Sequence, residues 1–184
     1  MGRAQADRAA GPLAALAPVR LLSSDLDRAR STAAPLAEVT GLEVTLDARL
    51  RELDLGAWQG LTGQQARERF PDEHAAWRSG ADVRRGGGET YAEAAERAGE
   101  CLLEHLPDVE PGGTLVAVTH GGTARACVGR LLELPSASWG RLAPLGNCCW
   151  SVLVEHPAGW RLEQHGAGLD VAPATVTGAD RRPL

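Results

Sequence analysis

Short apolar runs alternate with longer stretches of helical period along most of the chain. The runs predict strands at residues 19–23, 43–46 and 114–119. The helical stretches predict helices over residues 2–17, from Ser24 to about Val39, from Thr90 to about Leu106, and from Gly121 to about Leu134. Because strands alternate with helices, we expect an α/β domain with a largely parallel sheet that is covered on both faces.

Capping residues and glycines set the expected ends of these elements. Ser24 and Asp27 predict a capping box, and Gly41 is expected to close the same helix. Thr90 and Glu93 predict a second capping box. Residues 62–80 are expected to form short helices broken at a proline, and 48–63 to be irregular. Residues 148–155 and 160–164 predict a hairpin. We expect a single domain over residues 1–165 and a polar tail over 166–184.

Composition narrows the class of protein. The 184-residue chain has a net charge of −5, which does not favour a nucleic-acid partner. No apolar run approaches the roughly 18–20 residues that cross a bilayer, and the amino terminus lacks the apolar segment of a secretory signal. The four cysteines form no C-x-x-C pair, which favours a reduced, cytoplasmic location. Since the chain has no lysine, an arginine counts as functional only on a positional argument.

His120 follows the predicted strand 114–119 and is followed by Gly121 and Gly122. This order puts the imidazole at the carboxyl edge of the sheet, beside the amino terminus of the next helix. Free N–H groups and the helix dipole favour an anion at such a place. His120 could donate a hydrogen bond to a phosphoryl oxygen, or offset its charge as an imidazolium. The alternative is a core histidine that is satisfied by the backbone.

Ser24 and Arg28 come directly after the strand 19–23, so they are expected at the same edge. From there the guanidinium could hold two phosphate oxygens as a bidentate fork. The alternative is a surface arginine that pairs with Asp25 or Glu38, or has no partner.

Glu52 and Glu89 are the candidate carboxylates. Glu52 lies in a loop with Trp58 and leucines, whose apolar walls would favour the protonated form and allow it to protonate a leaving alkoxide. The alternative is a solvated carboxylate, with Asp54 as a rival. Glu89 could line the same site as Glu52, or its negative charge could stabilise the amino terminus of the helix that follows it. No metal or cofactor motif is present in the sequence, and no two histidines have metal-ligand spacing.

Several segments occur together and in order: Gly2–Ala6, Ser23–Thr32, Leu50–Gly60, Gly88–Arg97 and Val118–Gly122. In this combination the chain resembles the histidine phosphatase superfamily, also called phosphoglycerate mutase-like. The resemblance implies a three-layer α/β/α sandwich and hydrolysis of a phosphomonoester through a phosphohistidine. It makes Arg28 the second phosphate-clamping arginine, Glu52 the general acid and then base, and His120 the second histidine.

The same resemblance implies further expectations about ligands. Ser24, Glu89 and Gly121 are expected to contact the substrate, and no cofactor is expected. The partner would be a small phosphorylated metabolite, either a sugar phosphate or a phosphoglycerate-type monoester, and the protein could form a homodimer. Residues 50–62, 134–139 and 145–150 are more similar to a phosphatase of the family than to its mutases, which favours hydrolysis.

The sequence departs from the family at one motif, because it contains no Arg-His-Gly. The resemblance places that motif, with the nucleophilic histidine, on the first central strand of the sheet. We therefore expect this strand to be lacking and to lie upstream of Met1, so that the 184-residue chain is truncated and has no turnover. Two alternatives are a pseudoenzyme that binds phospho-ligands without chemistry, and an interaction module whose sheet is completed by a partner strand.

Overall fold

The computed structural model describes residues 2–168, whose strands form two separate sheets. In the first sheet β1 (Pro18–Ser23) lies between β2 (Val44–Leu46) and β3 (Thr114–Val118), and both pairings are parallel. In the second, β4 (Trp150–His156) pairs antiparallel with β5 (Gly159–Ala167). The parallel sheet confirms the α/β prediction, and the hairpin confirms the expected turn near residue 158.

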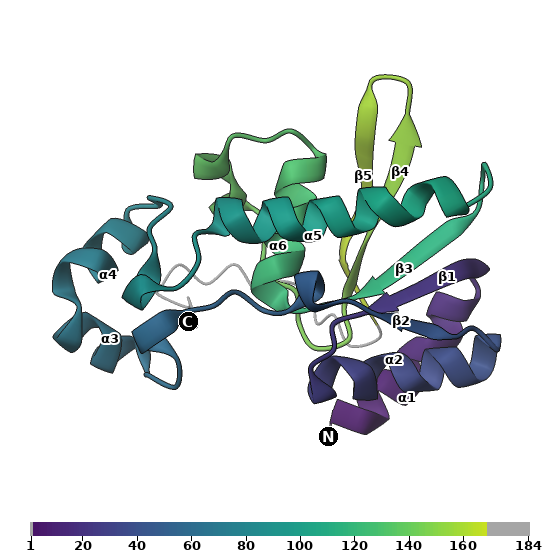
Figure 1. The fold of residues 1–184 in the computed structure, drawn as a ribbon, viewed down its shortest axis with the longest axis horizontal. Helices are drawn as coiled ribbons and strands as arrows, with labels where there is room; N and C mark the ends of the chain where they lie inside the picture. Colours follow the sequence, from purple (N-terminus) through teal and green to yellow (C-terminus); the bar gives the residue numbers. More distant parts are fainter. Residues whose placement is uncertain (1, 169–184) are drawn as a thin grey trace.

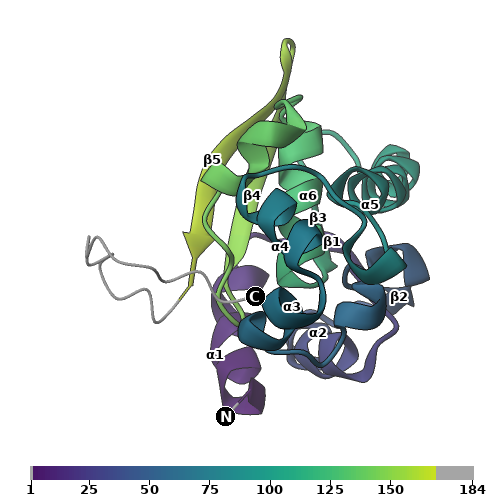
Figure 2. The same ribbon diagram turned by 90° about the vertical axis from the view of Figure 1, so that its left-hand side faces the viewer.

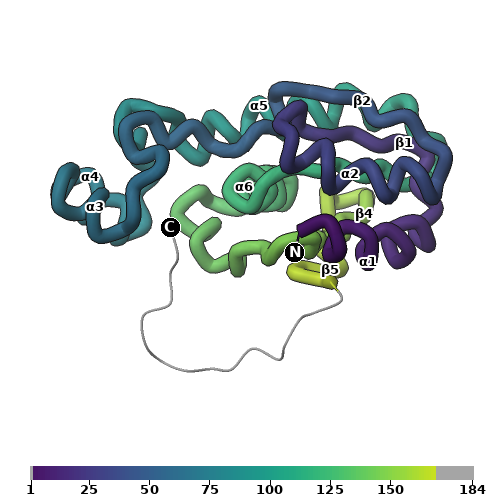
Figure 3. Tube along the Cα trace, turned by 90° about the horizontal axis from the view of Figure 1, so that it is seen from below, coloured from purple at the N-terminus to yellow at the C-terminus, as the bar shows by residue number. Residues whose placement is uncertain are grey.

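Helices cover the parallel sheet on both faces. Side chains alternate along the strands, so that Leu22 packs towards one hydrophobic cluster and Leu21 towards another. The first cluster includes residues of α5 (Tyr91–His105) and α6 (Gly121–Leu131), and the second includes residues of α1 (Gly2–Ala14) and α2 (Asp27–Thr40). Figures 2 and 3 show α5 and α1 on opposite sides of β1. This arrangement is the expected α/β/α sandwich.

Two short helices lie at one end of the molecule, away from the sheets (Figure 1). They are α3 (Gly63–Arg69) and α4 (Pro71–Arg78), so the predicted break at Pro71 is confirmed. α3 begins with a capping box between Thr62 and Gln65 that the sequence analysis did not identify. Five 3₁₀ turns complete the described part: η1 (Ala48–Leu50), η2 (Gly56–Trp58), η3 (Arg85–Gly87), η4 (Leu106–Asp108) and η5 (Ser136–Arg141).

One predicted helix start is wrong. α2 begins at Asp27, and its N-cap residue, Leu26, makes no side-chain capping bond. The hydroxyl of Ser24 instead accepts the N–H of Leu26 and lies 2.9 Å from a ring nitrogen of His120, so it is engaged before the helix begins. The other end was predicted well, because Gly41 adopts a left-handed conformation at φ 72° and closes the helix.

Other boundaries differ by a few residues. α1 ends at Ala14 and α6 at Leu131, both earlier than predicted, whereas β5 continues to Ala167. Most of the polar tail predicted for residues 166–184 lies outside the described residues. Among residues 2–168, no helix combines the length and apolar character that a membrane span requires.

The two sheets face each other across a cavity of about 1450 Å³, whose lining includes β3 and most of β4. Within the described residues, β3 pairs only with β1, and β4 pairs only with β5. Each of these strands therefore has one edge without a strand partner in the described part. The predicted lack of a strand in the middle of the sheet corresponds to this gap.

Candidate functional site

The carboxyl ends of β1 and β3 meet at one point. The backbone N–H of Ser24 donates to the carbonyl of Val118 at 2.9 Å, which holds the two strand ends together. Ser24 is fully buried and His120 is 9% exposed. Nε2 of His120 lies 2.9 Å from the hydroxyl of Ser24. The structure thus brings together two residues that the sequence analysis placed at the same sheet edge.

Arg28, in the first turn of α2, reaches the other nitrogen of the same ring. Its Nε–H donates to Nδ1 of His120 at 3.1 Å. Because Nδ1 accepts this bond, the neutral ring carries its proton on Nε2 and donates to Ser24. Asp25 is not the partner of Arg28, since it accepts two hydrogen bonds from Arg51, at 2.7 and 2.5 Å. Arg28 therefore faces the histidine.

His120 is held in its neutral form. Burial of the ring lowers the pKa of His120, and the positive charge of Arg28 lowers it further. A dianionic ligand near the ring would act in the opposite direction, because a nearby negative charge favours the protonated form.

The carboxylate of Glu52 lies at the amino terminus of α6. Its oxygens accept the backbone N–H of Gly122 at 3.3 Å and of Thr123 at 3.1 Å. The backbone N–H of Leu53 also donates to it at 2.9 Å. The anion expected at this helix terminus is therefore, in this structure, a side chain of the protein itself.

Of the two glycines Gly121 and Gly122, only one is needed for the close approach of the Glu52 carboxylate to α6. A Cβ on Gly122 would lie 2.8 Å from Oε1 of Glu52, whereas a Cβ on Gly121 would meet nothing nearer than 3.8 Å. Gly122 is thus the glycine that allows close approach. Gly121 lies between His120 and these N–H donors and lines the cavity, so its predicted contact with substrate stays a prediction.

The loop that carries Glu52 is clamped through its backbone carbonyls. Arg97 on α5 donates to the carbonyls of Arg49 at 2.5 Å and Arg51 at 2.9 Å. Thr119 donates to that of Leu50 at 2.7 Å, and Thr123 to that of Arg51 at 2.8 Å. The sequence analysis assigned no role to these three side chains. For Thr119 and Thr123, the one feature of the sequence that could have indicated a role is that they flank the His120-Gly-Gly turn.

Glu89 has a positioning role in this structure. Its carboxylate accepts from Arg97 at 2.7 and 2.8 Å and from the backbone N–H of Asp54 at 3.0 Å. The hydrogen bonds of Arg97 hold the pKa of Glu89 below its usual range. Glu89 thus ties α5 to the loop after Glu52, while its predicted contact with substrate stays a prediction.

Trp58, expected beside Glu52, makes its aromatic contacts with α3 and α4. The ring is 3% exposed and lies near the rings of Phe70, His74 and Trp77, with centroids 6.1, 5.9 and 6.0 Å away. The cluster attaches the two short helices to the loop. His74, which showed no functional pattern in the sequence, is part of this packing.

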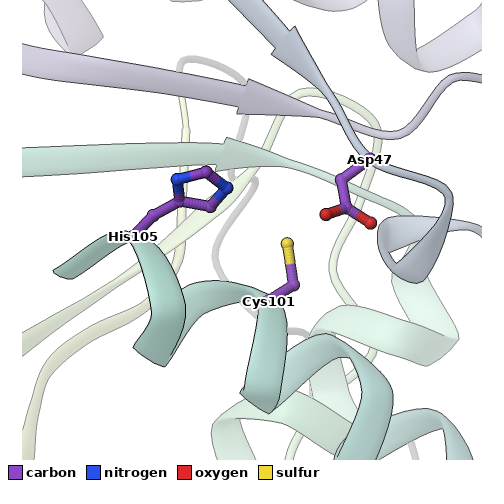
Figure 4. Close-up of side chains that lie close together, drawn as sticks. All are labelled: Asp47, Cys101 and His105. Atoms are coloured by element: carbon purple, nitrogen blue, oxygen red, sulfur yellow. The ribbon is translucent and has the colours of Figure 1, made fainter.

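Within residues 2–168, one group of side chains has metal-ligand chemistry. Asp47, Cys101 and His105 offer ligand atoms within 4.8 Å of one another, between the end of β2 and the last turns of α5 (Figure 4). Arg49, however, donates three hydrogen bonds to the carboxylate of Asp47. Burial raises the pKa of the Cys101 thiol to about 12, which opposes the thiolate that binds metal. The arrangement is therefore explained by packing and an ion pair.

Comparison with known proteins gives a consistent result. The model of the histidine phosphatase superfamily (branch 1) matches residues 1–168. A glucosyl-3-phosphoglycerate phosphatase of Mycobacterium tuberculosis is 38% identical over 187 aligned residues, covering 94% of this chain and 84% of that protein. A probable phosphoglycerate mutase of Salmonella paratyphi C is 30% identical, covering 86% of this chain and 74% of that protein.

Solved structures agree in fold as well as in sequence. A mycobacterial glucosyl-3-phosphoglycerate phosphatase in complex with VO3 is 40% identical, with a TM-score of 0.83. The match covers 90% of this chain and 84% of that one.

Proposed function

Since the chain belongs to the histidine phosphatase superfamily, we propose that Arg28, His120 and Glu52 are the phosphate-binding and acid–base groups of a phosphomonoesterase site. Arg28 and His120 would hold the phosphoryl oxygens, and Glu52 would exchange a proton with the leaving group. The likeness to phosphatases supports hydrolysis as the reaction class.

One observation carries this proposal. Arg28 from α2, His120 after β3 and Glu52 from the intervening loop all line the same cavity at the carboxyl edge of the parallel sheet. Ligands of open α/β sheets bind beyond this edge. A guanidinium and an imidazole joined by a 3.1 Å hydrogen bond supply adjacent donors once an anion replaces that contact.

The neutral state of His120 suits this role. With its pKa lowered by burial and by Arg28, the ring is uncharged in the free site and can take up a proton as a phosphate dianion arrives. Binding of an anion would therefore be accompanied by proton uptake. Glu52 in turn can leave the amino terminus of α6 and expose the N–H groups of Gly122 and Thr123 to the phosphoryl oxygens.

The substrate we propose is a small phosphorylated metabolite, of the sugar phosphate or phosphoglycerate type. The Mycobacterium tuberculosis relative is named as a phosphatase of glucosyl-3-phosphoglycerate, which is itself a phosphate monoester. That relative is 38% identical to this chain over most of its length.

We further propose that the 184-residue chain binds such esters without turnover. A phosphohistidine mechanism needs one histidine that attacks phosphorus and separate groups that steady the oxygens. The sequence contains no Arg-His-Gly motif, and His120 is bonded through both ring nitrogens to groups of the site. This favours a site that binds phosphate but lacks the nucleophile.

The test is calorimetric titration of the 184-residue chain with 3-phosphoglycerate, together with a phosphate-release assay. Arg28→Ala is expected to weaken binding by roughly tenfold or more, because charge-assisted hydrogen bonds contribute about 1.5–3 kcal/mol. Arg30→Ala is the matched control, since Arg30 lies on the same helix and pairs with the exposed Asp27 at 3.4 Å. It should bind like the unaltered chain, and none of the three proteins should release phosphate.

Two results would count against the proposal. Equal binding by the Arg28 and Arg30 variants would remove Arg28 from the site. Phosphate release that is lost in His120→Ala would show that the chain has a nucleophile after all, whereas release that persists in both His120→Ala and Arg28→Ala would come from a contaminating enzyme.

A further inference from the structure

Arg125 on α6 carries a charge without a partner. Its Nε is buried, and within residues 2–168 no group accepts a hydrogen bond from it. The side chain as a whole is only partly buried, so the rest of the guanidinium is open to a ligand. A buried donor that makes no hydrogen bond costs free energy, so its presence in a folded protein needs an explanation.

The arginines around Arg125 differ from it in this respect. Four of them, in the Glu52 loop and on α5 and α6, form ion pairs: Arg49 with Asp47, Arg51 with Asp25, Arg97 with Glu89 and Arg130 with Glu96. In the described part of the chain Arg125 pairs with no carboxylate. A guanidinium cannot lose its charge by deprotonation, so an anion from outside the chain would supply the missing partner.

The position of Arg125 on α6 places it beside Glu52. Gly122 lies three residues earlier on the same side of the helix, and a Cβ on it would be 2.8 Å from Oε1 of Glu52. Side chains of an α-helix lean towards its amino terminus, so Arg125 extends back over the turn that Glu52 contacts. The guanidinium is therefore directed towards the carboxyl edge of the parallel sheet.

The other direction along this side of α6 is closed. Gly129 lies four residues after Arg125, and a Cβ on it would be 2.5 Å from the ring of Trp139. Trp139 is 7% exposed, and its indole N–H donates to the carbonyl of Leu134 at 2.9 Å, which holds the ring in place. A ligand that meets Arg125 therefore approaches from the side of Glu52.

The role of Glu52 indicates which part of a substrate would lie there. An acid that protonates the leaving oxygen must contact that oxygen. Since Arg28 and His120 would hold the phosphoryl group, the leaving alcohol extends from Glu52 away from His120. Arg125 is the cation next to Glu52 along α6, and its planar fork fits the two oxygens of a carboxylate.

We propose that Arg125 is a specificity-determining residue, which binds an anionic group on the leaving alcohol of the phosphate ester. The inference rests on the proposed function, because it needs Glu52 to lie beside the leaving group. It separates esters whose leaving alcohol carries a carboxylate from esters whose leaving alcohol is uncharged. Arg125 contacts the substrate in this role but exchanges no proton with it.

The test compares 3-phosphoglycerate, glycerol 3-phosphate and inorganic phosphate in calorimetric titrations of the 184-residue chain. Glycerol 3-phosphate has a hydroxymethyl group where 3-phosphoglycerate has its carboxylate. The unaltered chain should bind 3-phosphoglycerate about tenfold or more tightly than glycerol 3-phosphate, because only the former pairs with Arg125. Arg125→Gln should abolish this preference and change the affinity for the other two ligands by less than about twofold.

Two further variants serve as controls. Arg130→Gln should keep the preference, because Arg130 lies on the same helix but is paired with Glu96 through two hydrogen bonds of 2.9 Å. Arg125→Lys keeps the charge without the planar fork and should keep part of the preference. Urea unfolding separates this role from a structural one, since Arg125→Gln removes no hydrogen bond of Nε and should not lower the free energy of unfolding.

The inference is overturned if Arg125→Gln weakens the binding of all three ligands equally, or if it leaves the preference intact. It is also overturned if the unaltered chain binds phosphate and both esters but does not prefer 3-phosphoglycerate. A chain that binds none of the three ligands would contradict the proposed phosphate site itself, and the role of Arg125 would fall with it.

Discussion

His120 shows how two hydrogen bonds can set the state of a single residue. Arg28 donates to Nδ1, so Nε2 keeps the proton and donates to Ser24. Burial and the charge of Arg28 lower the pKa of His120 below its usual value of 6.5. The residue is thus kept neutral, with its charge available once an anion is bound.

This state has a consequence for stability. The unfolded chain binds a proton at His120 more readily than the folded chain, so the contribution of His120 is present above pH 6.5 and is lost as the pH falls below it. In His120→Gln, which cannot titrate, the free energy of unfolding should fall less between about pH 7 and pH 5. Urea unfolding across this range measures the difference. An unchanged slope would mean that the pKa of His120 is not lowered.

At the scale of elements, the amino terminus of α6 and the loop around Glu52 form one unit. The loop is bonded to α6 through Glu52 and Thr123, and to α5 through Arg97. The amino terminus of α6, which could hold a ligand, thus holds the carboxylate of Glu52. This carboxylate accepts hydrogen bonds from N–H groups of the first turn of α6 in the free protein. The catalytic acid that we propose is positioned by the same contacts.

The Gly121 and Gly122 pair allows a matched test of this unit. Gly122→Ala would put a Cβ 2.8 Å from Oε1 of Glu52 and force the carboxylate away from the helix. We expect a loss of about 1–2 kcal/mol in unfolding free energy, from the broken hydrogen bonds. Gly121→Ala meets nothing nearer than 3.8 Å and should change stability by less than about 0.5 kcal/mol. Equal losses of unfolding free energy in the two variants, measured by urea unfolding, would contradict the position of the Glu52 carboxylate against Gly122.

The elements that the sequence predicted well are those set by local signals. Periodic apolar residues, the Thr90–Glu93 capping box and Gly41 gave helices whose ends agree with the structure within a few residues. The capping box at Ser24 failed because a tertiary contact, with His120, engages the hydroxyl. Local pattern does not report which distant residue competes for the same side chain.

The residues of the candidate site could be predicted in part from the sequence. Because ligands lie at the carboxyl edge of a parallel sheet, the sequence alone predicts Ser24, Arg28 and His120 at one place. The hydrogen bonds between Glu52 and the amino terminus of α6 could not be predicted, because they join residues 70 or more positions apart in the sequence. The hydrogen bonds from Arg97 to the loop around Glu52 could not be predicted either, because they join residues 45 or more positions apart. Their geometry exists only once α5, α6 and the loop have packed.

At the scale of the whole molecule, the fold divides into a closed half and an open half. Around β1 the sheet is paired on both sides and covered on both faces, and the candidate site lies on its carboxyl edge. Within the described residues β3 and β4 do not pair with each other, and all five residues of β3 are only partly buried. The candidate site borders the cavity between the two sheets, which Arg28, Glu52 and His120 line.

We propose that residues far apart in the chain form one phosphate-binding site around His120. Its most direct test is NMR of the imidazole rings as inorganic phosphate is added to the 184-residue chain, which has five histidines. We expect a saturable shift of the His120 ring towards the protonated form, which should be absent in Arg28→Ala. The other four histidines, His74, His105, His156 and His165, should not follow the same curve. A His120 ring that does not respond to phosphate would mean that His120 is not part of a phosphate-binding site.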